Sequence, residues 1–174
     1  MTAMHQPIRV LFLTHNYPRH AADSSGVFLR VLAQSLIKQG IQPVILAPHD
    51  AGLAEREEID EVLTVRFRYD TDDRETLAYR GNMHHVALGS LSGILQFNRF
   101  LASCEKSARA VVYSESIDLI WGHWLVPAGI VMKRLSAHSS LPMLLSSHGT
   151  DIRLLRKYNL LLGPYLRPLF RRLS

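Results

Sequence analysis

The chain has one cysteine, Cys104, among its 174 residues. A single cysteine excludes a disulfide framework, and no cysteine–histidine cluster stands at the spacing of a zinc site. His84 and His85 are adjacent, but neighbouring side chains point in different directions on a helix or a strand, so the pair does not form a metal site by itself. Cys104 lies on a helical apolar stripe, which predicts a buried, inert thiol. We therefore expect neither a metal nor redox chemistry.

Long apolar runs are also missing. None reaches the roughly 18 residues that a membrane-spanning helix needs, and residues 1–7 lack the apolar segment of a secretory leader. These absences predict a cytoplasmic protein. With 47% hydrophobic residues in 174, the chain has the size and composition of one globular domain with a full core.

Two phosphate-binding motifs are absent, namely the dinucleotide fingerprint G-x-G-x-x-G and the P-loop G-x-x-x-x-G-K-[ST]. What remains is Gly26, which follows Ser24 and Ser25 at the start of a helical pattern. Backbone amides at such a helix start can bind a phosphate, and a glycine lets the ligand approach closely. The alternative is that these three residues only cap the helix.

The charge is uneven along the chain, although the net value is +5. Most acidic residues lie between Glu55 and Glu75, whereas the stretch after Arg153 carries basic residues and no acid. This tail is compatible with contact with an anionic membrane, with phosphorylated substrates or with RNA, or it is simply a solvated flank. Residues 153–174 have helical apolar spacing broken by Gly163-Pro164 and Pro168, which predicts short, kinked helices.

Apolar periodicity predicts alternating strands and helices. We expect strands at 8–13, 43–47, 62–67, 118–121 and 142–147, and helices at 27–39, 91–112 and 127–137. This order predicts an α/β domain with a doubly wound, Rossmann-like parallel sheet flanked by helices. The strand order 3-2-1-4-5 would place the first strand beside the strand at 118–121.

Three polar loops should then meet at one edge of this sheet. In parallel sheets ligands bind where strands end, because the loops separate there and the helix N-termini carry partial positive charge. The loops contribute Asn16 and Gly26, then His123, and then the turn from His148 to Asp151. We expect His123 to leave its strand through a tight Gly122-His123-Trp124 turn. Its imidazole should lie at the open rim near Gly26, and Pro127 should begin the next helix.

Four segments together resemble the N-terminal domain of the GT-B glycosyltransferases of family 4. These segments are VLFLTHNYPR, then LRVLAQSLIKQGIQPVILAP after Gly26, then DLIWGHWLVPAG, and finally LLSSHGTDIR. The family consists of retaining enzymes and includes mannosyl- and glucosyltransferases of glycolipid and polysaccharide assembly. The resemblance covers nearly the whole chain and implies that residues 1–174 are a single Rossmann-like domain, one half of a GT-B fold.

The resemblance also implies an activity and roles for particular residues. Such an enzyme transfers a hexose from a nucleotide-sugar to a glycan, lipid or small-molecule acceptor, without a cofactor or a required metal. By this likeness Ser25 and Gly26 approach the donor diphosphate, and His123 bonds the transferred sugar as the catalytic candidate. The acceptor side would be lined by Asn16, His148, Gly149, Thr150 and Asp151.

Two departures from the family pattern limit these expectations. Many relatives have paired glycines where this chain has Ser25-Gly26. The second domain, which would carry a glutamate pair for the nucleotide-sugar, is absent from this chain. We therefore expect the isolated domain to be inactive and its own missing C-terminal domain to be its partner.

Two rival functions predict different features. One rival is a flavodoxin-like or receiver-like module that binds a phosphate or a partner. A receiver needs an acidic cluster after its first strand, where Thr14, His15 and Asn16 stand. An RNA-binding domain driven by the basic tail would show aromatic stacking motifs, which are lacking. We expect no nucleic-acid partner. Peripheral association with the inner face of a membrane would come from the tail.

Overall fold

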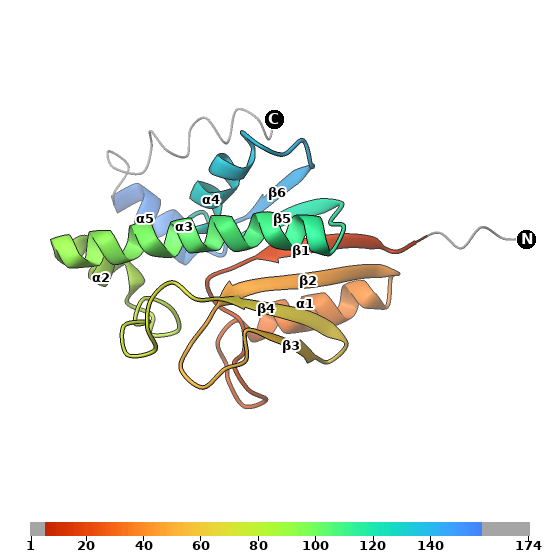
Figure 1. Ribbon diagram of the computed structural model, residues 1–174, viewed down its shortest axis with the longest axis horizontal. Coiled ribbons are helices and arrows are strands. Elements are labelled where there is room, and N and C mark those ends of the chain that lie inside the picture. The colour runs from red at the N-terminus through yellow and green to blue at the C-terminus, as the bar shows by residue number, and fades with distance from the viewer. Residues whose placement is uncertain (1–5, 158–174) are drawn as a thin grey trace, which may run out of the picture.

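Six strands form one sheet in the computed structural model, which describes residues 6–157 (Figure 1). The strands are β1 (Ile8–Leu13), β2 (Ile41–Pro48), β3 (Arg56–Ile59), β4 (Val62–Phe67), β5 (Leu119–His123) and β6 (Met143–Ser146). Their order is β3-β4-β2-β1-β5-β6, with every neighbouring pair parallel except β3 and β4. The predicted doubly wound α/β fold and the neighbouring positions of β1 and β5 are confirmed.

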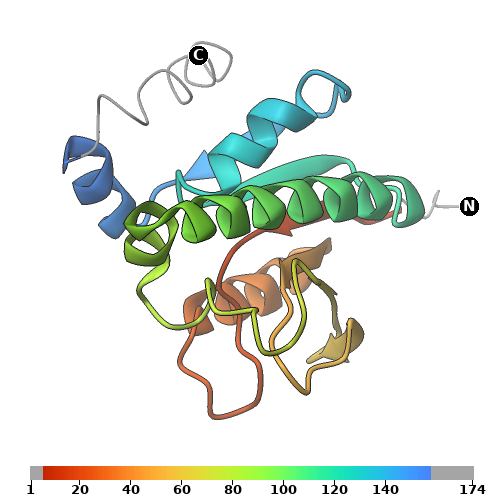
Figure 2. The same cartoon turned by 60° about the vertical axis from the view of Figure 1, so that its left-hand side comes forward.

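Helices cover both faces of the sheet. They are α1 (Val27–Ile37), α2 (Met83–Gly89), α3 (Leu91–Ser114), α4 (Ala128–Leu135) and α5 (Thr150–Lys157). The long α3 and the shorter α4 lie on one face, and α1 lies on the other (Figures 1 and 2). The structure thus has the helix–sheet–helix layering that right-handed crossovers between parallel strands produce.

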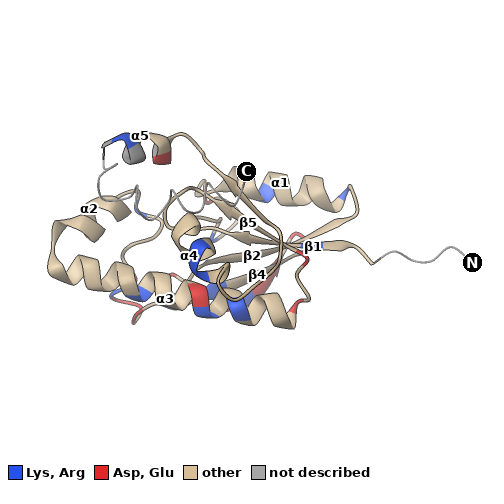
Figure 3. Cartoon of the chain, turned by 90° about the horizontal axis from the view of Figure 1, so that it is seen from above, with Lys and Arg blue, Asp and Glu red and all other residues tan. Residues whose placement is uncertain are grey.

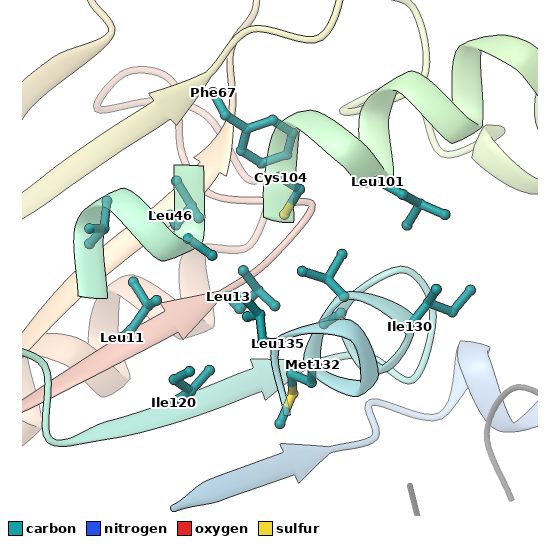
Figure 4. Packing of buried hydrophobic residues seen from close by; sticks show 14 of the residues in the cluster. Leu11, Leu13, Leu46, Phe67, Leu101, Cys104, Ile120, Ile130, Met132 and Leu135 are labelled. Carbon is teal, nitrogen blue, oxygen red and sulfur yellow. The ribbon is translucent and has the colours of Figure 1, made fainter. Parts of the chain in front are cut away.

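Strand β1 alternates between two apolar clusters. Leu11 and Leu13 pack with residues of α3 and α4, including Leu101, in the larger cluster (Figure 4). Val10 and Phe12 point to the other face and pack with residues of α1. A central strand buried on both faces reads as a continuous apolar run, which is why IRVLFL predicts it well.

The helices begin and end where local chemistry dictates. Gly40 has a φ of 76°, which suits the turn between α1 and β2. Ser90 is the N-cap of α3, and its hydroxyl accepts a hydrogen bond from the Gly93 amide at 3.0 Å.

Cys104 is buried on α3 as predicted, and burial raises the pKa of its thiol. This supports the expectation of an inert side chain.

The sequence missed two elements. Strand β3 pairs antiparallel with β4 at the sheet edge, and its sequence REEI is too polar to read as a strand. Helix α2 occupies residues around the His84-His85 pair, where no apolar period is evident. Both elements are short, and tertiary packing rather than local pattern stabilises them.

Charged residues lie mainly on the outer surfaces of the helices and on the loops (Figure 3). On the outer side of α3, Glu105 pairs with Arg109 at 2.7 Å and with Arg134 of α4 at 3.7 Å. Exposed pairs of this kind contribute about 0–1 kcal/mol each. No helix in the described part of the chain combines the length and apolarity needed to cross a bilayer.

Candidate active site

His123 is the last residue of β5, at the carboxyl edge of the sheet. The strand runs to His123 rather than ending at Trp121, so the prediction that Gly122 and His123 form a tight exit turn is wrong. Position 122 requires glycine because α4 packs on it: a Cβ there would lie 2.2 Å from the Met132 sulfur. Its register with Leu13 and Leu145 fixes the side-chain direction of His123, away from α4 and toward the α1 face.

The imidazole of His123 is 0% exposed. Three rings pack against it: Phe12 at 4.7 Å between ring centroids, Trp121 at 5.1 Å and His148 at 5.4 Å. Our expectation that this imidazole lies at an open rim is therefore wrong for the described chain. Trp121 lies on the same strand, but the sequence could not reveal that Phe12 of β1 and His148 from the loop after β6 complete the cover.

One nitrogen of His123 has a partner and the other has none. Nδ1 lies 3.3 Å from Nε2 of His148, whereas Nε2 of His123 is buried without a hydrogen-bond partner. Burial, and to a smaller extent the neighbouring His148, lowers the pKa of His123 to about 3. The ring is thus neutral at pH 7 and carries one unsatisfied polar atom. Such atoms are uncommon in folded proteins and cost about 1–3 kcal/mol.

The turn after β5 begins at Trp124, which has a φ of 68°. The left-handed region costs a non-glycine residue about 1–2 kcal/mol, so surrounding contacts must hold it there. The Trp124 amide donates to the Ser146 carbonyl at 2.8 Å, which ties this turn to the end of β6. Pro127 is the N-cap residue and α4 starts at Ala128, one residue later than predicted.

Gly26 lies against the loop that follows β1. Its φ is 69°, and a Cβ at this position would be 2.5 Å from the Asn16 carbonyl oxygen. The structure therefore confirms that Gly26 and Asn16 lie together, and both the backbone angle and the close approach require glycine. Gly26 is the N-cap of α1, with no side chain bonded to the cap amides. The Ser25 amide donates to Asp23 at 3.0 Å, which shapes the approach to the helix.

A buried charge network holds this first loop in place. Arg66 on β4 donates to the Pro18 carbonyl at 2.8 Å and pairs with Glu57 at 2.7 Å. Arg19 pairs with Asp23 at 2.6 Å, a contact that lowers the pKa of Asp23 against the opposing effect of burial. This support was not predicted, because an arginine inside a strand pattern normally indicates a solvent-facing position.

The turn from His148 to Asp151 joins the same edge. Asp151 is 4% exposed and bridges its own turn and the turn after β5. One carboxylate oxygen accepts from the Leu125 amide at 2.9 Å, and the other accepts from the Ser147 hydroxyl at 2.8 Å and from the amides of His148 and Ile152. Burial raises the pKa of Asp151, but these hydrogen bonds outweigh it and lower the pKa below its usual value. Gly149 is exposed and has a φ of 88°. Thr150 is the first residue of α5, and the structure does not describe its side chain.

Aromatic contacts connect the three loops. Phe28, in the first turn of α1 and 41% exposed, packs on His148 at 4.8 Å and on Trp124 at 5.6 Å between ring centroids. His15, in the loop after β1, packs on Trp124 at 4.6 Å. The predicted convergence of loops is thus observed: the segment that holds Gly26 reaches His123 through Phe28 and His148.

His15 is a site candidate that the sequence analysis did not select. Its Nδ1 is buried without a partner, as is Oδ1 of the neighbouring Asn16. Burial lowers the pKa of His15 to about 4, although Asp151 opposes the shift. The available signal was position: His15 follows a central strand at the edge where His123 was already expected.

A possible metal-ligand group lies elsewhere among the described residues. His49, Asp72 and Glu75 bring ligand atoms within 4.8 Å of one another. Both nitrogens of His49 are already hydrogen-bonded, Nδ1 to Glu75 at 2.6 Å and Nε2 to the Leu53 carbonyl at 2.8 Å. A metal would have to displace these bonds, so the arrangement fits a structural pair better than an ion site.

The fold and this edge together match one Rossmann-like half of the GT-B architecture, and comparison with known proteins agrees. The model of Glycosyltransferase Family 4 matches residues 25–174, so the chain belongs to that family. The family assignment favours the glycosyltransferase over the flavodoxin-like module.

The similar proteins are distant and longer. TuaC of Bacillus subtilis (strain 168), named as a teichuronic acid biosynthesis glycosyltransferase, is 23% identical over 156 residues, covering 87% of this chain and 39% of TuaC. Sucrose-phosphate synthase of Thermosynechococcus elongatus has a similar fold, with a TM-score of 0.59 and 15% identity over 86% of this chain and 35% of that one. A second solved chain under that name has a TM-score of 0.52 and 16% identity, and the match covers 87% of this chain and 68% of that one.

Proposed function

We propose that this chain is the acceptor-side domain of a retaining glycosyltransferase. The enzyme would transfer a hexose from a nucleotide-sugar to a glycan, lipid or small-molecule acceptor. One observation carries the proposal: in a family 4 chain, a neutral histidine at the carboxyl edge of the sheet keeps one buried nitrogen without a partner. A ligand that supplies a hydroxyl group there would remove the cost of the unsatisfied atom.

His123 would hold the transferred sugar rather than move its proton as a strong base. Its pKa of about 3 makes it a weak base, which suits a hydrogen bond from Nε2 to a sugar hydroxyl. Retaining transfer through an oxocarbenium-like state mainly requires a held sugar and a stabilised leaving group. Because Nε2 is buried, sugar contact requires a movement of the residues that cover it.

The start of α1 would receive the leaving diphosphate. The residues here are Ser25, whose amide is bonded to Asp23, and Gly26, and no side chain caps the helix. Backbone amides and the positive end of the helix dipole favour an anion, and the absence of a Cβ at Gly26 permits close approach. Asn16, His148, Gly149 and Thr150 would face the acceptor, while Asp151 would act by holding the turn.

The proposal includes a second domain that binds the nucleotide-sugar. The chain spans 39% of the length of the curated relative it matches. By this proposal the isolated chain is inactive, the full-length enzyme is cytoplasmic and needs no metal, and its substrates are a nucleotide-sugar and a sugar or glycolipid. The basic tail that would contact an anionic membrane lies outside the described residues. Sedimentation with anionic vesicles at low salt tests that contact.

Transfer assays on the full-length protein test the proposal. We expect one member of a panel of nucleoside-diphosphate hexoses to give a product with retained anomeric configuration, at an EDTA-insensitive rate. His123→Ala should lower kcat/KM at least about tenfold, or about 1.4 kcal/mol. His138→Ala is the matched control, since His138 is exposed beyond the end of α4. Unchanged transfer by His123→Ala would remove His123 from the active site.

A further inference from the structure

Four contacts position His148. Its backbone amide donates to Asp151 at 3.2 Å, and its ring packs on Phe28 and on Trp124, the latter at 4.7 Å between centroids. The fourth contact is with His123, whose ring lies within 25° of parallel to it. His148 therefore cannot turn freely, and its Nε2 stays opposite Nδ1 of His123.

We propose that His148 is a positioning residue that fixes the ring orientation and the tautomer of His123, with Asp151 holding His148 in place. The role of His123 in sugar transfer rests on the proposed function above. The coupling between the two rings stands on the hydrogen bond alone.

The coupling follows from the chemistry of neutral imidazole, which has one donor nitrogen and one acceptor nitrogen. If His148 donates from Nε2, Nδ1 of His123 accepts and its free Nε2 carries the hydrogen. If His148 accepts, the free Nε2 of His123 is bare. Either way, the state of His148 decides whether the unpartnered atom of His123 donates or accepts toward a ligand.

Both rings are neutral near pH 7, so the tautomer is the remaining variable. Burial lowers the pKa of His123 to about 3 and also lowers the pKa of His148, which Asp151 partly opposes. The titratable groups that face this pair are His15 and Asp151. The Asp151 carboxylate favours a charged His148, but burial outweighs it. His15 also has a lowered pKa, and Asp151 has its carboxylate engaged by amides and a hydroxyl.

Nitrogen-15 NMR of histidine-labelled protein tests the inference without any sugar. In the unmodified chain we expect the shifts of His123 to report one dominant tautomer. His148→Phe keeps a ring against Phe28 and Trp124 but removes the nitrogen, so the His123 signals should move to a mixed or reversed tautomer. His148→Gln, whose amide can still bond Nδ1, should preserve a single tautomer. His138→Phe is the control and should leave His123 unchanged.

Asp151→Asn provides a second, milder variant if the ring replacement impairs folding. It replaces one acceptor oxygen by a donor, so the signals of His148 and His123 should shift together. Unchanged His123 shifts in His148→Phe, with the remaining spectrum native, would overturn the proposal.

Transfer assays on the full-length enzyme then separate this inference from the proposed function. If His148→Phe changes the tautomer and lowers kcat while the KM for the nucleotide-sugar stays constant, both hold. If the tautomer changes and transfer does not, the coupling holds and the proposed function of His123 fails.

Discussion

Two fully buried histidines at the carboxyl edge of the sheet differ in how their ring nitrogens are satisfied. His49 follows β2 and bonds Glu75 through Nδ1 and the Leu53 carbonyl through Nε2. His123 ends β5, bonds only His148, and leaves Nε2 without a partner. Burial alone therefore does not distinguish a structural histidine from a functional one. The two rings differ in that His123 keeps a nitrogen available for a ligand, and this difference is the ground on which we propose it for the site.

Removing Glu75 should have the largest effect on stability. Glu75→Ala leaves His49 buried without its carboxylate and deprives the Tyr69 amide of its acceptor. Breaking a buried, hydrogen-bonded pair in this way costs about 3–5 kcal/mol. Urea unfolding of the chain measures it. Glu75→Gln, which keeps an acceptor, is the control and should lose less. A loss below about 1 kcal/mol for Glu75→Ala would show that the pair does not support the fold.

Gly26→Ala should come next. The new Cβ would lie 2.5 Å from the Asn16 carbonyl oxygen, so the backbone would have to move, and Gly26 has a φ of 69°. The left-handed angle alone costs about 1–2 kcal/mol, and the contact adds to it. Gly52→Ala is the matched control, because its φ is also positive but nothing lies within 4 Å. Equal unfolding free energies for the two variants would contradict the close packing of Gly26 on the first loop.

Much of this edge could be predicted from the sequence, and the reason is local. The apolar run of β1 and the stripe of α1 set the topology, so Asn16, Gly26 and His123 had to share one edge once the strand order was known. The burial of His123 could not be predicted, because Phe12 on β1 and His148 after β6 complete its cover and lie far from it in the sequence.

The supporting network and the role of Asp151 were equally hidden. Arg66 reads as a surface residue on alternating β4, and only the tertiary fold brings Pro18 and Glu57 to its guanidinium. Asp151 reads as a site carboxylate, whereas its oxygens are used by amides from two loops. Contacts between residues far apart in sequence decide both cases, and no local pattern encodes them.

The acid response should separate His123 from the rest of the chain. Burial keeps His123 neutral in the fold, with a pKa of about 3, whereas its pKa in the unfolded chain is 6.5. Between pH 6.5 and pH 3, therefore, only the unfolded chain binds this proton. Stability is therefore lost as pH falls through that window. His123→Phe removes this proton uptake. As pH falls from 6 to 4, the stability of the variant relative to wild type should therefore rise by up to about 1.4 kcal/mol per pH unit. Parallel stability curves would mean that His123 is not kept neutral by burial.

The smallest effect should come from the ring that links α1 to the other loops. Phe28→Ala removes contacts with Trp124 and His148 and should cost about 0.5–1.5 kcal/mol. Val31→Ala, on the same helix and 57% exposed, should stay within about 0.5 kcal/mol. Equal losses of unfolding free energy in the Phe28→Ala and Val31→Ala variants, measured by thermal or urea unfolding, would show that the Phe28 contacts do not stabilise this edge of the sheet.

The most direct test combines stability and activity in one variant, His123→Phe, made in the full-length enzyme. Phenylalanine fills the same ring site without the unsatisfied nitrogen, so the unfolding free energy at pH 7 should be unchanged or higher. Sugar transfer should nevertheless fall at least about tenfold in kcat/KM. Transfer at the wild-type rate, or a loss that only follows unfolding, would contradict the assignment of His123 to the active site.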